Sequence, residues 1–409
     1  MKTIVVNGGA ALTGRISVSG SKNAALPILF ACIMTRGINE IENLPDIGDV
    51  NIALEILRSL GAEITRRGAT AYINTENLEY RTPDPRLISK IRASTYLIGA
   101  CLSRFGSCEI GSFGGCSFSA RPIDMHLDAC RALGAEVGNG IITAPRLTCG
   151  EINFAKKSVG ATVNAILLAS GAVGKTTVTG CACEPHIDAL IDFLRSCGGE
   201  ITRCGDRLEI QGRELHGGKC AIFGDMIEAG SYLAAGVITG GKITVDKCPV
   251  DQMSAVIDSL TGLGAEISAS ERSITAYSAG IGRPCHIIAS PYPGFPTDLQ
   301  PIFAVLLARV AGGSICDTVW RERFGYLDAL GAFGIKSAVR DNTALVSKSP
   351  FKAADAVSPD LRGGMACLLS ALGAEGQSKI HSAEIILRGY ENLIEKFSAL
   401  GANIKMQDT

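Results

Sequence analysis

The stretch Leu60-Gly61-Ala62-Glu63-Ile64 follows an amphipathic run with apolar residues at positions 52, 54, 57 and 60. Only glycine enters the left-handed backbone region cheaply, so Gly61 is predicted to cap a helix and Glu63 to begin a strand. The same corner recurs along the chain, with its glycines 64 to 73 residues apart, at 133–137, 197–201, 263–267, 330–332 and 400–404. Such a period indicates six structural repeats.

Each repeat also contains an apolar helix upstream of this corner. A short polar group precedes it, at 21–23, 92–95, 160–162, 228–231, 297–298 and 360–362. Runs such as 24–31 and 165–172 are apolar nearly all round, which is typical of buried helices. A glycine turn and a short β-like run follow, as at 37–41, 174–178 and 241–245. The order βαβαββ, with three repeats per globule, predicts two similar α/β domains whose buried helices are surrounded by sheets.

Composition limits the classes of function. The chain has 409 residues, of which 46% are hydrophobic and 5% aromatic, and its 39 Lys and Arg balance 40 Asp and Glu. Without a basic field or many stacking platforms, we expect no binding to nucleic acid or to an anionic membrane surface. No apolar run reaches the roughly 18 residues that a membrane span needs. Small-molecule chemistry is therefore the leading class.

Fifteen cysteines are scattered over the chain, and no CxxC pair occurs. We expect reduced thiols that mostly fill the core, with no structural metal and no cofactor. The first nine residues hold too short an apolar stretch for a secretory signal. The expected location is the cytoplasm.

Lys22 stands at the mouth of an apolar helix, directly before Asn23. An ammonium and the free backbone N–H groups of a first helical turn would together grip a phosphate. Arg92, Asp298 and Arg362 hold corresponding positions in other repeats. Since a buried unpaired charge is costly, these side chains are expected to face a polar cleft. For any single helix start, a purely structural role fits equally well.

Two further segments carry reactive side chains. Cys116 follows two glycines and precedes Arg121 by five residues, which suits a mobile loop with its thiol in a cationic, anion-binding setting. Asp298 lies at a helix start behind the proline-rich turn 293–296. Its carboxylate would either cap that helix or act as a base, and spacing alone leaves both interpretations open.

Together these segments resemble the enolpyruvyl transferase family, and within it the branch that acts on UDP-N-acetylglucosamine. The resemblance covers nearly the whole chain and rests on 21–27, 92–94, 114–116, 120–124, 158–162, 293–298, 360–362 and 388–391. It implies two inside-out α/β barrels of three repeats each, with the active site in the cleft between them. It also implies that 22–223 form one domain, with the Cys116 loop and part of the nucleotide-sugar site. Residues 1–21 would join 224–409 in the second, with Asp298 and anion-binding arginines.

The resemblance implies a reaction. The enolpyruvyl group of phosphoenolpyruvate would pass to the 3-hydroxyl of UDP-N-acetylglucosamine through a tetrahedral ketal, with loss of phosphate, as the first committed step of peptidoglycan synthesis. Cys116 would protonate the methylene carbon, or transiently take the enolpyruvyl group, and Asp298 would remove the hydroxyl proton. Lys22 is the third residue that the resemblance places in catalysis.

Binding residues are implied in the same way. Those for phosphoenolpyruvate are Lys22, Asn23, Arg121, Arg323, Arg362 and Arg388. Those for the UDP-sugar are Arg92, Arg121, Pro122, Ile123, Asp124, Met125, Lys156, Lys157, Ser158, Val159, Asp298 and Val319. The partners would be these two small substrates, and the oligomeric state is left open.

Two positions depart from the family pattern. Leu387 stands where an acidic residue is usual and Met226 where an arginine is common, and both are expected near anion binders. Two alternatives therefore stay open: a transferase with another acceptor, such as shikimate 3-phosphate or another nucleotide, and a silent relative that binds a nucleotide sugar and regulates a partner. A silent relative would have no chemical need for six residues that this chain contains: Lys22, Cys116, Arg121, Asp298, Arg362 and Arg388.

Overall fold

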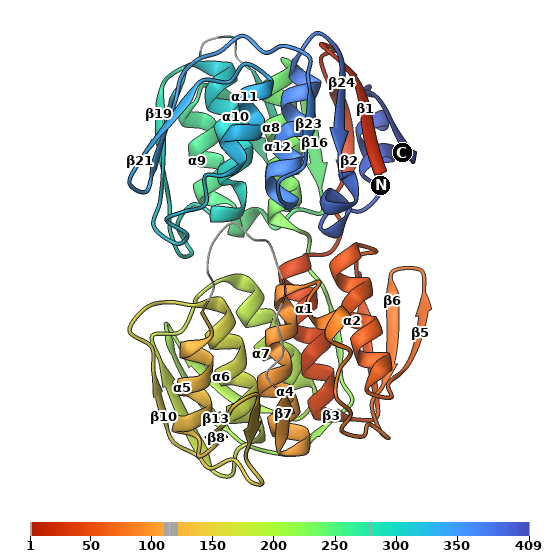
Figure 1. The fold of residues 1–409 in the computed structure, drawn as a ribbon, viewed down its shortest axis with the longest axis vertical. Coiled ribbons are helices and arrows are strands. Elements are labelled where there is room, and N and C mark those ends of the chain that lie inside the picture. Colours follow the sequence, from red (N-terminus) through yellow and green to blue (C-terminus); the bar gives the residue numbers. More distant parts are fainter. Residues whose placement is uncertain (1, 110–113, 115–121, 279, 281, 409) are drawn as a thin grey trace. The chain divides into compact units, whose positions relative to one another are not determined.

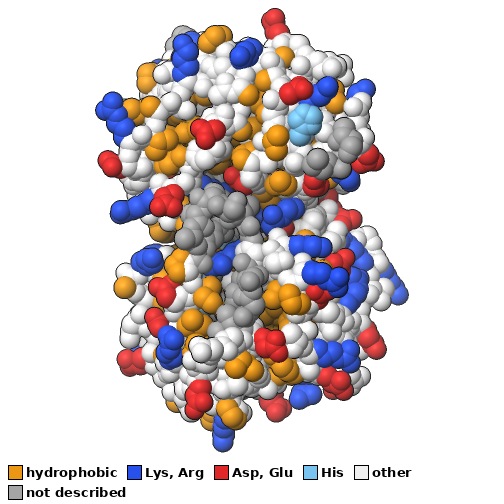
Figure 2. Space-filling model, viewed as in Figure 1, with side chains coloured by type: hydrophobic (Ala, Val, Ile, Leu, Met, Phe, Trp, Pro, Cys, Tyr) orange, Lys and Arg blue, Asp and Glu red, His pale blue; other side chains and the backbone are white. Residues whose placement is uncertain are grey.

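The structure, a computed structural model, describes residues 2–109, 114, 122–278, 280 and 282–408. They form two compact units (Figure 1). We call residues 20–109, 114 and 122–223 the middle unit, and residues 2–19 with 224–408 the terminal unit. Acidic and basic side chains are interspersed over the visible face of both units (Figure 2). No helix among the described residues is long and apolar enough to cross a membrane.

Five four-stranded sheets share one strand order and one pattern of direction. In the first of them, β10 (Glu151–Asn153) pairs in parallel with β11 (Lys175–Thr179), and β13 (Arg207–Gln211) pairs antiparallel with β11 and with β12 (Glu200–Cys204). The others are β15-β4-β6-β5, β2-β16-β18-β17, β19-β20-β22-β21 and β23-β24-β1-β25. A sixth sheet, β7-β9-β8, has three strands among the described residues. The predicted set of six repeats is confirmed, three in each unit.

Strands from distant parts of the chain complete three of the sheets. In the middle unit, β15 (Lys219–Ala221) closes the sheet of β4 (Ile38–Glu42), β6 (Thr70–Asn74) and β5 (Glu63–Arg67). In the terminal unit, β1 (Lys2–Gly8) and β2 (Thr13–Ser17) join sheets built by later residues.

The remaining strands complete these sheets. They are β7 (Ser107–Glu109), β8 (Glu136–Val137), β9 (Ile141–Thr143), β16 (Lys242–Asp246), β17 (Ala265–Ala269), β18 (Ser273–Ser278), β19 (Cys285–Ala289), β20 (Gly313–Asp317), β21 (Ser337–Arg340), β22 (Thr343–Val346), β23 (Asp355–Val357), β24 (Gly376–His381) and β25 (Asn403–Asp408). Separately, β3 (Thr35–Arg36) pairs in parallel with β14 (Leu215–His216).

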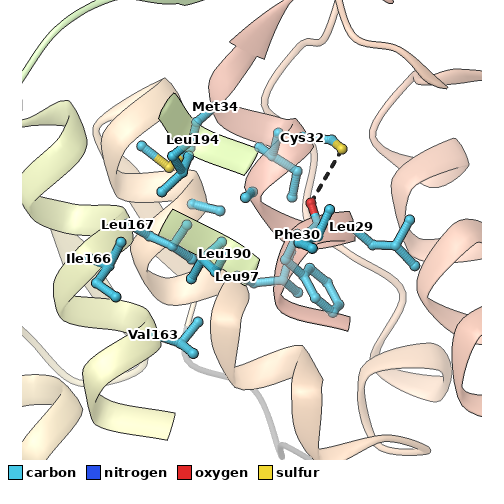
Figure 3. Close-up of a cluster of buried hydrophobic side chains, with 14 of the residues drawn as sticks. Leu29, Phe30, Cys32, Met34, Leu97, Val163, Ile166, Leu167, Leu190 and Leu194 are labelled. Carbon is cyan, nitrogen blue, oxygen red and sulfur yellow. Dashed lines mark hydrogen bonds between the residues drawn. The ribbon is translucent and has the colours of Figure 1, made fainter. Parts of the chain in front are cut away.

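One apolar helix per repeat lies in the core, as predicted. These helices are α1 (Lys22–Ala31), α4 (Leu97–Phe105), α6 (Val159–Gly171), α8 (Met226–Thr239), α10 (Gln300–Val310) and α12 (Leu361–Gly373). Every residue of α12 is buried, and the helix packs against α8 and α10 and against strands β1 and β24. Figure 3 shows the packing in the middle unit, where Phe30 of α1, Leu97 of α4 and Leu167 of α6 meet, together with Leu190 of α7.

The second helix of each repeat is amphipathic. These are α2 (Gly48–Ser59), α5 (Asp124–Ala132), α7 (Pro185–Ser196), α9 (Ser254–Gly262), α11 (Tyr326–Ala332) and α13 (Leu393–Ala399), and a short α3 (Pro85–Ile88) precedes the second repeat. Gly61, with φ at +99°, adopts the left-handed conformation that the repeat predicts.

The fifth copy of the corner corrects the prediction. Gly331 does not end a helix, since α11 continues through Ala332. Gly334 adopts the left-handed conformation instead, with φ at +83°. The glycine that follows the helix is therefore Gly334, three residues later than the match Leu330-Gly331-Ala332 predicted. The extra turn buries Phe333 in the core.

Candidate functional site

In the terminal unit, Asp298 forms a cluster with two buried arginines. It lies on the 3₁₀ turn Thr297–Leu299, just before α10. Its Oδ1 accepts a hydrogen bond from Nη1 of Arg323 at 2.8 Å, and its Oδ2 accepts from Nη2 of Arg362 at 3.0 Å. The arginine side chains are 4% and 3% exposed, and that of Asp298 is 27% exposed. The Asp298 carboxylate is thus an ion-pair partner of both arginines and is partly exposed.

Arg362 is held from several sides. Its guanidinium lies over the ring of Tyr390 at 5.4 Å, and the Tyr390 hydroxyl is 2.8 Å from that of Ser231. Burial opposes the charge, but Tyr390 and Asp298 hold the pKa of Arg362 above its usual range. Its Nη1 is buried and has no partner among the described residues. A buried donor without an acceptor is costly, so this atom suits an incoming anion.

Asp360 positions Arg362 through the backbone. Its side chain caps α12 by accepting from the N–H groups of Arg362 and Gly363 at 2.9 and 3.1 Å. Arg388, at the end of the 3₁₀ helix Ala383–Arg388, is half-buried. The departures Leu387 and Met226 are partly buried and pack against the apolar core of this unit. Both positions therefore serve packing here.

Asp317, at the end of β20, is a residue that the sequence reasoning missed. It is wholly buried and accepts three hydrogen bonds, from Thr297 and from the backbone of Val319 and Trp320. Val319 itself is 36% exposed. No pattern in the sequence distinguishes Asp317 from any aspartate that follows a strand.

In the middle unit, Lys22 is the first residue of α1, and half-buried Asn23 follows it. The Lys22 ammonium lies 3.3 Å from Oδ2 of Asp49, in the first turn of α2. The two side chains are 13% and 6% exposed. Asp49 is the second residue that the sequence reasoning missed, and it places a buried carboxylate beside the expected phosphate binder.

A second polar network in this unit links α4, α5 and α6 close to Arg92. Arg92 lies on the 3₁₀ turn Arg92–Tyr96, before α4. His126 of α5 is buried, and its Nδ1 accepts from Nδ2 of Asn164 at 2.7 Å. Oδ1 of Asn164 accepts from the N–H of Gly99 at 2.7 Å. Burial, reinforced by the charge of Arg92, lowers the pKa of His126 to about 4, so the imidazole is neutral near pH 7.

The remaining residues expected at the UDP-sugar lie at two helix starts. Pro122 and Ile123 precede Asp124 and Met125, which begin α5. Lys156 and Lys157 precede Ser158, whose hydroxyl caps α6 by accepting from the N–H of Ala161 at 3.3 Å, with Val159 as the first helical residue. The N-terminus of α6 has the backbone donors and dipole that favour a phosphate.

The structure brings some of the expected site residues into contact, and others lie outside the part of the chain that it describes. Asp298, Arg323 and Arg362 are in direct contact. Cys116 and Arg121 lie outside the described residues. Within the described ranges, no group of three or more His, Cys, Asp and Glu side chains is arranged to hold a metal ion.

Comparisons with known proteins agree over the whole length. The family model of EPSP synthase (3-phosphoshikimate 1-carboxyvinyltransferase) matches residues 6–397. The UDP-N-acetylglucosamine 1-carboxyvinyltransferase of Prosthecochloris aestuarii is 39% identical, covering 100% of this chain and 99% of the relative. The enzyme of the same name from Campylobacter jejuni is 38% identical, with 99% of each chain covered.

Solved structures show the same fold. The enolpyruvyl transferase NikO from Streptomyces tendae matches with a TM-score of 0.90 and 26% identity, covering 100% of this chain and 99% of that one. EPSP synthase from Acinetobacter baumannii matches with a TM-score of 0.74 and 18% identity over 100% of both chains, which is a likeness of fold alone. Six repeats in two inside-out barrels, the full-length family match and relatives near 39% identity lead to one conclusion: the chain belongs to the EPSP synthase family of enolpyruvyl transferases.

Proposed function

We propose that this chain transfers the enolpyruvyl group of phosphoenolpyruvate to the 3-hydroxyl of UDP-N-acetylglucosamine with release of phosphate, the first committed step of peptidoglycan synthesis. The contact of Asp298 with Arg323 and Arg362 carries the proposal. Two buried guanidiniums are suited to hold a substrate carboxylate, and the carboxylate between them is suited to take a proton. Full-length similarity to relatives named for this reaction supports the choice of acceptor.

In the proposed addition, Asp298 removes the proton of the acceptor hydroxyl while Cys116 delivers a proton to the methylene carbon, or transiently takes the enolpyruvyl group. In the elimination, the methyl group of the tetrahedral ketal gives up a proton as the C–O bond to phosphate breaks, which restores the C=C bond and gives the product. Lys22, Arg121 and Arg388 hold the phosphate, because a highly anionic leaving group needs cations around it. Arg323 and Arg362 hold the carboxylate.

The nucleotide sugar, in this proposal, lies against Arg92, Asp124 and the start of α6 at Ser158, with Val319 from the terminal unit. The proposed domain 22–223 then contributes the Cys116 loop and part of the UDP-sugar site, and the proposed domain of 1–21 with 224–409 contributes the base and the arginines. We expect both sets of residues to act on one pair of substrates. A cytoplasmic location fits the fourteen described cysteines, all of which are free thiols.

Phosphate release by the purified protein tests the proposal. Phosphoenolpyruvate is supplied with UDP-N-acetylglucosamine, and with shikimate 3-phosphate or UMP as parallel acceptors. Release with the nucleotide sugar alone is expected. Phosphate release only with another acceptor would show that the proposed acceptor is wrong and that the enolpyruvyl transfer is right. No release with any acceptor would favour a silent relative that binds a nucleotide sugar.

A further inference from the structure

We propose that Asp317 and Thr297 are positioning residues that fix the carboxylate of Asp298 and tie it to the segment carrying Val319. The inference rests on the proposed function, because it takes Asp298 as the base. Asp317 and Thr297 act through other groups, since neither is expected to touch the substrates.

Asp317 joins two chain segments through its two carboxylate oxygens. Oδ2 accepts a hydrogen bond from Oγ1 of Thr297 at 2.6 Å. Oδ1 accepts from the backbone N–H groups of Val319 at 2.9 Å and Trp320 at 2.8 Å. The side chain is wholly buried, where a carboxylate is tolerated only when hydrogen bonds replace its water. Three short contacts meet that requirement and hold both segments against the end of β20.

The hydrogen bonds of Thr297 have a defined direction. Oγ1 of Thr297 donates its single hydroxyl proton to Oδ2 of Asp317. The lone pairs of Oγ1 are then left for Nη1 of Arg323, which lies 3.2 Å away and can only donate. The same Nη1 donates to Oδ1 of Asp298 at 2.8 Å. The acceptor oxygen of Asp317 therefore sets the direction of this chain of hydrogen bonds, which ends on the proposed base.

This chain restrains the reacting groups on both sides. Asp298 is fixed through Arg323 and through its backbone neighbour Thr297, while Val319, expected beside the nucleotide sugar, is fixed by the other oxygen of Asp317. The buried carboxylate of Asp317 thus fixes the position of the proposed base, Asp298, relative to Val319, which is expected beside the acceptor. A misplacement of about 1 Å in such a pair is enough to cost on the order of 100-fold in rate.

Thr297→Val tests this inference, because it removes the hydroxyl with little change of volume, and Thr297→Ser restores the hydroxyl. We expect Thr297→Val to lower kcat by about 10- to 100-fold per folded enzyme, with the KM of UDP-N-acetylglucosamine changed by less than about threefold. The acid limb of the kcat–pH profile should move to higher pH, because Asp298 loses a well-aligned guanidinium. Thr297→Ser should recover most of the activity.

Thr244→Val is the matched control. It removes a hydroxyl of the same unit that lies 2.8 Å from the hydroxyl of Thr275, and it should leave kcat and its pH profile unchanged. A Thr297→Val enzyme that is less stable but has wild-type kcat per folded molecule would show a merely structural role and overturn the inference. Equal losses in Thr297→Val and Thr297→Ser would also overturn it.

A measurement without turnover separates this inference from the proposed function. If the wild-type protein releases no phosphate, the proposed function fails, but the hydrogen-bond chain is still tested by thermal unfolding of Thr297→Val, Asp317→Asn and the double variant. If the two side chains belong to one chain of hydrogen bonds, the unfolding temperature of the double variant should fall little further than that of the less stable single variant. Additive decreases would overturn the inference. If Asp317→Asn does not fold, Arg323→Lys takes its place in the cycle, with the same two outcomes.

Discussion

The ammonium of Lys396 lies 2.6 Å from Oε1 of Glu228 and 2.8 Å from Oγ of Ser19. The N–H of Ser19 donates to Oε2 of the same carboxylate at 2.8 Å. The Glu228 side chain is only 3% exposed. These contacts tie α8 and α13 to the segment that follows β2. Burial raises the pKa of Glu228 to about 7, against the opposing effect of the ion pair with Lys396.

This pKa predicts a stability that depends on pH. Because it lies above the ordinary value of 4.5, the folded chain binds the proton more tightly than the unfolded chain does. The stabilising contribution of Glu228 to the free energy of unfolding is fully present below pH 4.5 and is lost as the pH rises through about 7. Relative to Glu228→Gln, the wild-type free energy of unfolding should fall by up to about 3 kcal/mol across that window. Urea unfolding at stepped pH measures it, and parallel curves for the two proteins would refute the assignment.

His126 predicts the opposite slope in the middle unit. Its folded pKa of about 4 lies below the ordinary 6.5, so the contribution is present above pH 6.5 and is lost as the pH falls through about 4. In His126→Asn, an amide oxygen can accept from Asn164 without titrating. Between pH 4 and 6.5, the wild-type free energy of unfolding should rise by up to about 3 kcal/mol relative to this variant.

Exposed His286, whose Nδ1 lies 2.7 Å from the hydroxyl of Ser314, supplies the matched control variant His286→Asn. The effects of Glu228 and His126 have opposite signs in nearly the same pH range. The wild-type stability alone should therefore vary less with pH than that of either variant, and a wild-type profile steeper than both would contradict this pair of predictions.

Asp49→Asn should weaken phosphoenolpyruvate binding more than acceptor binding. The substitution removes the charge that lies 3.3 Å from the Lys22 ammonium, and a displaced ammonium meets the phosphate less well. We expect the KM of phosphoenolpyruvate to rise by about tenfold, with less than about threefold change in the KM of UDP-N-acetylglucosamine. Initial rates of phosphate release measure both constants.

Asp46→Asn is the control for Asp49→Asn, because Asp46 precedes the same helix and its side chain is 63% exposed. It should leave both KM values unchanged. Equal changes in the two KM values of Asp49→Asn would indicate that Asp49 supports the fold rather than Lys22.

Most of the fold can be predicted from the repeat, because the spacing of hydrophobic residues and the glycines that cap helices are local properties of the sequence. Where they failed, at Gly331, a helix with buried Phe333 extended to the next available glycine, Gly334, and tertiary packing decided between them. The site was less accessible. Asp317 and Asp49 contact partners that are 20 and 27 residues away in the sequence. No local sequence pattern predicts which partner a carboxylate will contact in the folded chain.

Asp298→Asn should affect turnover and stability together. Loss of the proposed base should lower kcat by about 10²–10⁴-fold. The variant also leaves the buried Arg323 and Arg362 without their counter-charge, so the unfolding temperature should fall. Stopped assays of phosphate release and calorimetry measure the two effects. Asp251→Asn, at an exposed residue of the same unit, is the control, and a kcat within about twofold of wild type in Asp298→Asn would exclude Asp298 as the base.

Thiol labelling tests the role of Cys116 without any assumption about its geometry. Cys149 and Cys204 are exposed thiols, so neutral iodoacetamide should label both of them. An epoxide phosphonate of the fosfomycin type carries charges like those of a substrate phosphate, and it should label Cys116 selectively if Lys22 and the arginines direct it there. Peptide mass spectrometry identifies the labelled residue.

The substitutions that accompany this experiment separate attraction of the reagent from reactivity of the thiol. Lys22→Ala should abolish labelling by the phosphonate while leaving that of Cys149 and Cys204 by iodoacetamide unchanged, because only the anionic reagent needs a cation. Cys116→Ser should lower turnover by at least about 10²-fold, whereas Cys116→Asp should retain activity, since a carboxylic acid also delivers a proton. Phosphonate on Cys149, or full activity in Cys116→Ala, would remove Cys116 from the mechanism, and the proton for the methylene carbon would then have to come from another group.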